Sequence, residues 1–161
     1  MSSFDELFDY PGGAPTDAGV ATGPVFGGDW TAETWVQVLA FSDQRRLRPR
    51  ERLIRAGDVD RSVFILQEGL LEAVVRTHGG TRRFPMEPGA VIGEVAFFDG
   101  EERSADVVAV DPSLVRRFSE ESLERLSARH PDLGRAFVFG LGTLLAFRLR
   151  RAEANGQGQR R

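Results

Sequence analysis

The chain has 161 residues, a net charge of −3 at pH 7 and no cysteine. This length fits one domain, and the lack of cysteine excludes a disulfide framework and a thiolate metal site. No stretch approaches the roughly 18 apolar residues of a membrane span, and no signal peptide is visible, so we expect a cytoplasmic protein without a membrane partner. The acidic balance argues against direct DNA binding, which depends on clustered positive charge.

Both ends of the chain lack the apolar content of a folded domain. Residues 1–28 are rich in glycine, proline and acidic side chains, and we predict that they form a disordered acidic tail. Within this tail Phe4, Leu7 and Phe8 have helical spacing, which leaves open a segment that folds onto a partner. Residues 155–161 are predicted to be a frayed basic tail.

Between the tails, the apolar residues change their period along the chain. A helix is predicted over residues 31–40, and short β-branched runs then alternate with Gly, Asp and Pro turns as far as Ser119. This spacing is typical of an antiparallel β jelly-roll barrel, so we expect a mainly β domain with flanking helices over residues 29–154. The predicted strands include residues 53–54, 63–66, 70–75, 107–110 and 114–115.

Two helices are predicted after the strands. Ser119 suits the N-cap of the first helix, and Pro131 suits the first position of the second, which is expected to end near Ala154. Three glycines lie in the second helix: Gly134, Gly140 and Gly142. Two interpretations stay open, because the glycines either weaken a helix that docks and undocks or permit it to pack closely on the strands.

The most informative stretch is the segment from Gly93 to Ser104. Gly93 and Glu94 are predicted to begin a short helical turn, whose backbone amides and partial positive charge suit a phosphate. Arg103 suits a bidentate contact to two phosphate oxygens, with Ser104 as a further donor. Glu94 suits a neutral hydroxyl instead, because two anions repel each other. Taken alone, these residues also allow an ordinary Glu94–Arg103 salt bridge.

This run resembles the phosphate-binding cassette of the cyclic-nucleotide-binding domain family, and the resemblance extends over roughly residues 31–152. It implies that Glu94 accepts a hydrogen bond from the ribose 2′-OH and that Arg103 pairs with the cyclic phosphate. Ser104 and the cassette amides would complete the cradle. The implied ligand-binding residues are Gly93, Glu94, Val95, Ala96, Arg103, Ser104, Ala105 and Arg148.

The resemblance also implies that the final helix covers the base, with Leu144, Leu145 and Arg148 as the candidates. Arg148 falls where a relative carries a threonine that reads adenine, so the base preference is open. We favour cAMP over cGMP, and a cyclic dinucleotide is a third option. The alternative for Arg148 is a solvated arginine of the tail.

We therefore expect a stand-alone cyclic-nucleotide sensor that is not an enzyme and has no catalytic cofactor or metal. Only His78 and His130 are present, which is too few for a histidine metal triad. The chain stops soon after the last helix, so any output is expected to pass to an effector protein or through a homodimer built on the Leu141 and Leu144 stripe. The alternative function is a ligand-independent interaction module of the same fold.

Overall fold

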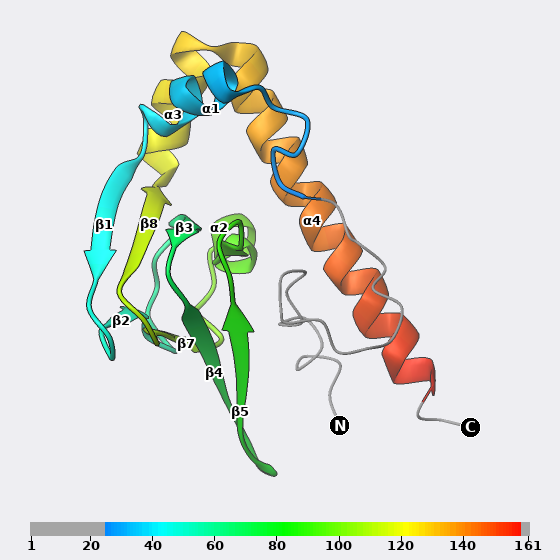
Figure 1. Cartoon of the computed structure of the whole chain (residues 1–161). Helices are drawn as coiled ribbons and strands as arrows, with labels where there is room; N and C mark the ends of the chain where they lie inside the picture. Colours follow the sequence, from blue (N-terminus) through cyan, green and yellow to red (C-terminus); the bar gives the residue numbers. More distant parts are fainter. Residues whose placement is uncertain (1–24, 159–161) are drawn as a thin grey trace.

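The computed structural model describes residues 25–158 and confirms the predicted fold class (Figure 1). Eight strands are framed by one helix before them and two after them, with a short helix between the sixth and seventh strands. The elements are α1 (Ala32–Leu39), β1 (Asp43–Leu47), β2 (Arg52–Ile54), β3 (Val63–Glu68), β4 (Leu71–Thr77), β5 (Gly80–Met86), β6 (Val91–Ile92), α2 (Glu94–Asp99), β7 (Asp106–Ala109), β8 (Ser113–Phe118), α3 (Glu120–Arg129) and α4 (Pro131–Gly158).

The strands form two antiparallel four-stranded sheets. One sheet has the order β1-β8-β3-β6 and the other has the order β2-β7-β4-β5. Consecutive strands such as β1 and β2 therefore lie in different sheets, which is the arrangement of a jelly roll. The two sheets are not closed into one continuous barrel, and this is the one respect in which the predicted barrel is too specific.

The four apolar residues of β3 are all buried, because both faces of the strand are covered. Phe64 and Leu66 face the core between the two sheets, whereas Val63 and Ile65 face a second core beneath the helices. Side chains alternate along a strand, so a strand covered on both faces has no polar positions in its centre. The helices α1, α3 and α4 thus cover the outer face of the β1-β8-β3-β6 sheet.

Side-chain caps fix where two of the helices begin. The hydroxyl of Thr31 accepts a hydrogen bond from the backbone of Thr34 at the start of α1. Ser119 accepts one from the backbone of Ser122 at the start of α3, as predicted. Each cap satisfies an amide that has no partner within its helix.

The packed part of the chain begins earlier than the predicted boundary at residue 29. Phe26 is only 7% exposed and packs edge-on against Trp30 and Phe137. A single large ring gains enough from burial to hold this turn against the helices, although two glycines follow it. The rest of the predicted acidic tail, with its Phe4, Leu7 and Phe8 motif, lies outside the described residues.

Helix α4 continues to Gly158, four residues beyond its predicted end. Two of its glycines permit close packing. A Cβ atom on Gly134 would lie 2.8 Å from the Cα of Ser127 in α3, and one on Gly140 would lie 3.0 Å from the ring of Phe26. A Cβ on Gly142 would meet nothing within 4 Å. The close-packing interpretation therefore applies to Gly134 and Gly140.

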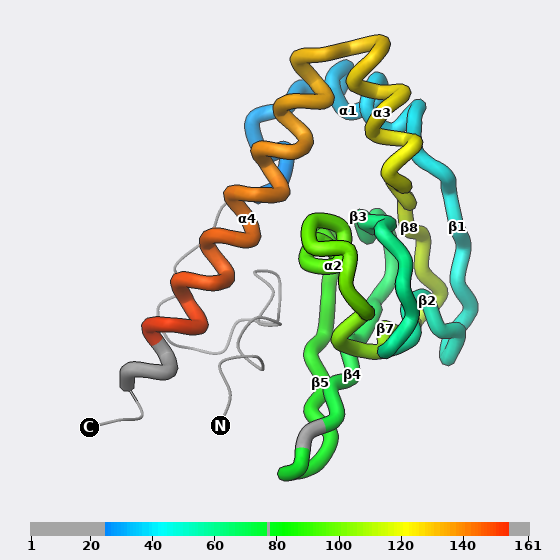
Figure 2. The backbone as a smooth tube through the Cα atoms, turned by 180° about the vertical axis from the view of Figure 1, so that it is seen from behind, coloured from blue at the N-terminus to red at the C-terminus, as the bar shows by residue number. Residues whose placement is uncertain are grey.

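The prediction that Leu141 and Leu144 of α4 form a homodimer surface is wrong. Leu141 and Leu144 are 0% and 3% exposed, because both pack into the core beneath the helices. The apolar residues that α4 does expose include Val138 and Leu149. Figures 1 and 2 show the last turns of α4 lying apart from the strands. Within residues 25–158, no helix combines the length and the apolar character needed to cross a bilayer.

Candidate functional site

The site is built around the sharp turn that precedes α2. Gly93 caps this helix in the left-handed conformation, with φ of 90°, and Gly100 ends it in the same conformation. A Cβ on Gly93 would collide with Nη1 of Arg103 and lie 3.0 Å from the carbonyl oxygen of Ser62. Glycine is therefore required here both for the backbone conformation and for the close approach of the arginine.

Arg103 lies beneath this turn and is only 5% exposed. Its Nη1 donates to the carbonyl of Gly93 at 3.0 Å, and its Nη2 donates to Oδ2 of Asp60 at 2.8 Å and to the carbonyl of Ser62 at 2.6 Å. Its Nε atom is buried and has no hydrogen-bond partner among the described residues. A buried donor without a partner costs free energy, and it is a natural place for a ligand oxygen.

Asp60 is the counter-ion of Arg103, although its own side chain is 42% exposed. Burial acts to raise the pKa of Asp60, but hydrogen bonds from Arg103 and Ser62 outweigh it and leave the pKa below its usual value. Arg117 lies 3.6 Å from the other carboxylate oxygen. Asp60 and Ser62 were not predicted to belong to the site, because both precede β3 and lie more than 40 residues from Arg103 in the chain.

Glu94 and Arg148 form a second ion pair, which is buried on both sides. The two side chains are 4% and 2% exposed, and Nη1 of Arg148 donates to Oε1 of Glu94. Arg148 also donates from Nη2 to the carbonyl of Val91 in β6 at 3.1 Å. The pair thus joins α4 to α2 and β6. It excludes the alternative in which Arg148 is a solvated tail residue.

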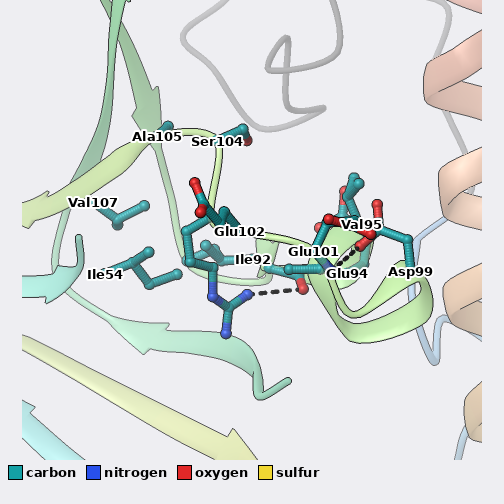
Figure 3. Close-up of a pocket in the computed structure, with 13 residues that line it drawn as sticks. Ile54, Ile92, Glu94, Val95, Asp99, Glu101, Glu102, Ser104, Ala105 and Val107 are labelled. Carbon is teal, nitrogen blue, oxygen red and sulfur yellow. Dashed lines mark hydrogen bonds between the residues drawn. The ribbon is translucent and has the colours of Figure 1, made fainter. Parts of the chain in front are cut away.

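A cavity of about 170 Å³ lies between α2 and the strands, and Arg103 lines it. Figure 3 shows Ile54 and Val107 on one side of the cavity and the start of α2, with Glu94 and Val95, on the other. Apolar walls of this kind exclude water and strengthen electrostatic contacts inside. The arrangement suits a small ligand with one anionic group directed at Arg103.

Seven of the eight predicted site residues line this cavity: Gly93, Glu94, Val95, Ala96, Arg103, Ser104 and Ala105. Ser104 is exposed, so its hydroxyl is accessible. Arg148 does not line the cavity and reaches it through Glu94. Leu144 is in the core beneath the helices. The alternative salt bridge between Glu94 and Arg103 is not formed, because each of the two residues has a different ionic partner.

The described residues contain no group of three or more histidine and carboxylate side chains that could hold a metal ion. His130 instead packs edge-on against the ring of Phe41, at the break between α3 and α4. The buried charged side chains at the site are Arg103, Arg148 and Glu94.

The chain is similar to known proteins in both sequence and structure. A sequence profile of the cyclic nucleotide-binding domain matches residues 44–130. The chain is 36% identical over 115 residues to the cyclic AMP receptor protein of Thermus thermophilus, an alignment that covers 68% of this chain and 50% of the relative. The crystal structure of the catabolite activator protein of that organism superposes with a TM-score of 0.72 at 26% identity, and the match covers 83% of this chain and 62% of that one.

A third relative is a much longer protein whose name is that of an enzyme. Glutaminase 2 of Bradyrhizobium diazoefficiens is 31% identical over 117 residues, which cover 73% of this chain but only 18% of the relative. The chain spans at most half the length of the curated relatives it matches. The shared part is thus a domain that occurs within longer proteins of different kinds.

Proposed function

The chain belongs to the cyclic nucleotide-binding domain family, and from this premise we propose that it is a cAMP sensor, with cGMP as the second choice of ligand. In this proposal the protein catalyses nothing, acts in the cytoplasm and signals to an effector protein. The observation that carries the proposal is the buried guanidinium of Arg103, which lines a cavity and keeps an unsatisfied Nε–H donor. The 36% identity to a cyclic AMP receptor protein favours cAMP.

Arg103 supplies the positive charge for the cyclic phosphate. A guanidinium has five N–H donors, and the three hydrogen bonds to Gly93, Asp60 and Ser62 hold its plane in place. A ligand phosphate then meets a donor that is already oriented, so little side-chain entropy is lost on binding. Ser104 is exposed beside it and supplies a further hydroxyl donor.

Glu94 keeps its role as the acceptor for the ribose 2′-OH in this proposal. An ionised carboxylate accepts several hydrogen bonds, so the bond from Arg148 leaves capacity for a neutral hydroxyl. Arg148 then links the ribose contact to α4. If α4 has two positions, ligand binding at Glu94 would shift the equilibrium between them only to the extent that the ligand binds one position more tightly than the other.

The alternative is a module of the same fold that binds a protein and no nucleotide. Calorimetric titration with cAMP, cGMP and a cyclic dinucleotide separates the two functions. We expect binding of cAMP, and we expect R103L to weaken it by roughly 2 to 3 kcal/mol, on the order of 100-fold. R125L, which removes an exposed arginine of α3, serves as the control, and circular dichroism checks folding. Three flat titrations of the unmodified protein would support the interaction module.

A second titration tests Glu94 separately from Arg103. The 2′-deoxy analogue of cAMP lacks the hydroxyl that Glu94 is proposed to hold. We expect E94A to weaken binding of cAMP more than binding of this analogue. Equal losses for both ligands would remove the proposed role of Glu94 without affecting that of Arg103.

We also propose that α4 pairs with α4 of a second copy, through a face other than the predicted one. Val138, Leu145 and Leu149 recur at intervals of seven and four residues, which is the spacing of a coiled-coil seam. Val138 and Leu149 are 41% and 53% exposed. Sedimentation equilibrium should show a dimer that L149E weakens at least about tenfold, whereas V110E, at an exposed apolar residue elsewhere, should not. A monomer at all concentrations would refute this pairing.

A further inference from the structure

Three carboxylates that the proposed mechanism does not use stand along the same cavity as Arg103. Asp99, Glu101 and Glu102 all line it and are all exposed (Figure 3). The backbone amide of Glu101 donates to Oδ1 of Asp99 at 2.9 Å, which holds that carboxylate beside the turn. Within residues 25–158, none of the three takes part in an ion pair. We call these three residues the acidic rim.

The charges around the cavity are otherwise balanced. Arg103, the one cation among the residues that line the cavity, is paired with Asp60 at 2.8 Å. The charge of Glu94 is balanced by Arg148. The acidic rim therefore leaves the residues that line the cavity with a net negative charge, even though the proposed ligand is an anion. The Nε–H of Arg103 has no hydrogen-bond partner, and no second cation lines the cavity to receive another negative charge.

We infer that the acidic rim makes the site selective for a phosphate group with a single negative charge. A cyclic phosphodiester carries one charge, whereas a phosphomonoester carries about 1.5 to 2 charges at pH 7. The additional charge of the monoester meets like charges across partly solvated space, where each unit interaction is modest and weakened by salt. The rim thus rejects linear nucleotides such as AMP by repulsion, while Arg103 attracts both kinds of ligand.

The volume of the cavity supports the same selection. About 170 Å³ is below the roughly 300 to 1,000 Å³ of typical small-molecule pockets, so it suits one phosphate and part of a sugar. A ligand with two phosphates would have to place its second charge near the rim. A cyclic dinucleotide is therefore disfavoured by charge.

This inference rests on the proposed function, and its test separates the two. The E101Q/E102Q double variant removes two rim charges without changing side-chain shape, and E121Q/E124Q removes two exposed charges from α3 as the matched control. Affinities for cAMP and AMP are measured by competition at pH 7.5 in low salt. We expect the double variant to bind AMP about tenfold more tightly and cAMP no more than about threefold more tightly, with both gains reduced in high salt.

The control should leave the ratio of the two affinities unchanged. An unchanged ratio in E101Q/E102Q, or AMP binding that still escapes detection in this variant, overturns the inference while cAMP binding stands. A failure of cAMP to bind the unmodified protein overturns the proposed function itself. An equal gain for both ligands would show that the rim repels anions without selecting among them, which also refutes the inference.

Discussion

Two buried arginines hold the site together, and their surroundings differ. Arg103 is paired with Asp60, whose side chain is 42% exposed, whereas Arg148 is paired with Glu94, whose side chain is 4% exposed. Arg103 also lines a cavity, which Arg148 does not. The first ion pair is thus open to water and to a ligand, and the second is enclosed by protein.

The difference separates two functions of buried charge. An enclosed pair gains little net stability, because desolvation offsets most of the attraction, but loss of either partner leaves a costly unpaired charge. The Arg148 pair therefore acts as a connection between α4 and α2. In the other pair Asp60 is partly exposed to solvent, and it holds the cation of Arg103 in position for a further anion. Three variants test this comparison.

The largest effect is expected for R148L, which leaves the carboxylate of Glu94 buried without a counter-ion. Such a loss costs about 3 to 5 kcal/mol, measured as the free energy of unfolding in urea. R150L, at an exposed arginine two residues along α4, should change it by no more than about 0.5 kcal/mol. The E94L/R148L double variant should recover most of the stability. A loss below about 1 kcal/mol for R148L would show that the pair is not enclosed.

A smaller effect, on ligand binding, is expected for G93A. The added methyl group requires Arg103 to move, so cAMP affinity should fall about tenfold or more as its guanidinium leaves the turn. G89A is the matched control, since Gly89 has a similar φ of 96° but open space around its Cβ position. Both variants should lose about 1 to 2 kcal/mol of stability from backbone strain. Equal ligand affinities for the two variants would contradict the position of Arg103.

The smallest effect concerns pH and Asp60. Its pKa in the folded protein is lowered, so the unfolded chain takes up the proton first as the pH falls. The stability from this group is present above the unfolded value near pH 3.9 and is lost as the pH falls through the lower folded value. Urea unfolding from pH 5 to pH 3 should show a steeper loss for the unmodified protein than for D60N. The difference should stay under about 1 kcal/mol, because the carboxylate is partly solvated.

A D60N variant with an identical pH profile would mean that the bond between Asp60 and Arg103 contributes no measurable stability. A profile in which D60N loses stability more steeply would contradict the direction of the pKa shift. Either result would weaken the comparison between an open and an enclosed ion pair.

Local patterns in the sequence were sufficient for much of the fold. The apolar run of β3, the N-cap at Ser119 and the proline at the start of α4 all act within a few residues, so their effects can be predicted without the rest of the chain. Strands β1 and β5 were not predicted. Both are mostly exposed and polar, and they form because a neighbouring strand supplies their hydrogen bonds.

The short helix of the cassette and its flanking glycines could be predicted from the sequence alone, because they depend on local backbone conformation. The ionic partners of the two buried arginines, in contrast, depend on tertiary packing. Arg103 pairs with Asp60, which is 43 residues away in the sequence, and Arg148 pairs with Glu94, which is 54 residues away. Glu94 is much nearer to Arg103 in the sequence, yet the two do not pair. A buried charge pairs with the opposite charge that the packing brings within reach, and in both of these pairs that partner is distant along the chain.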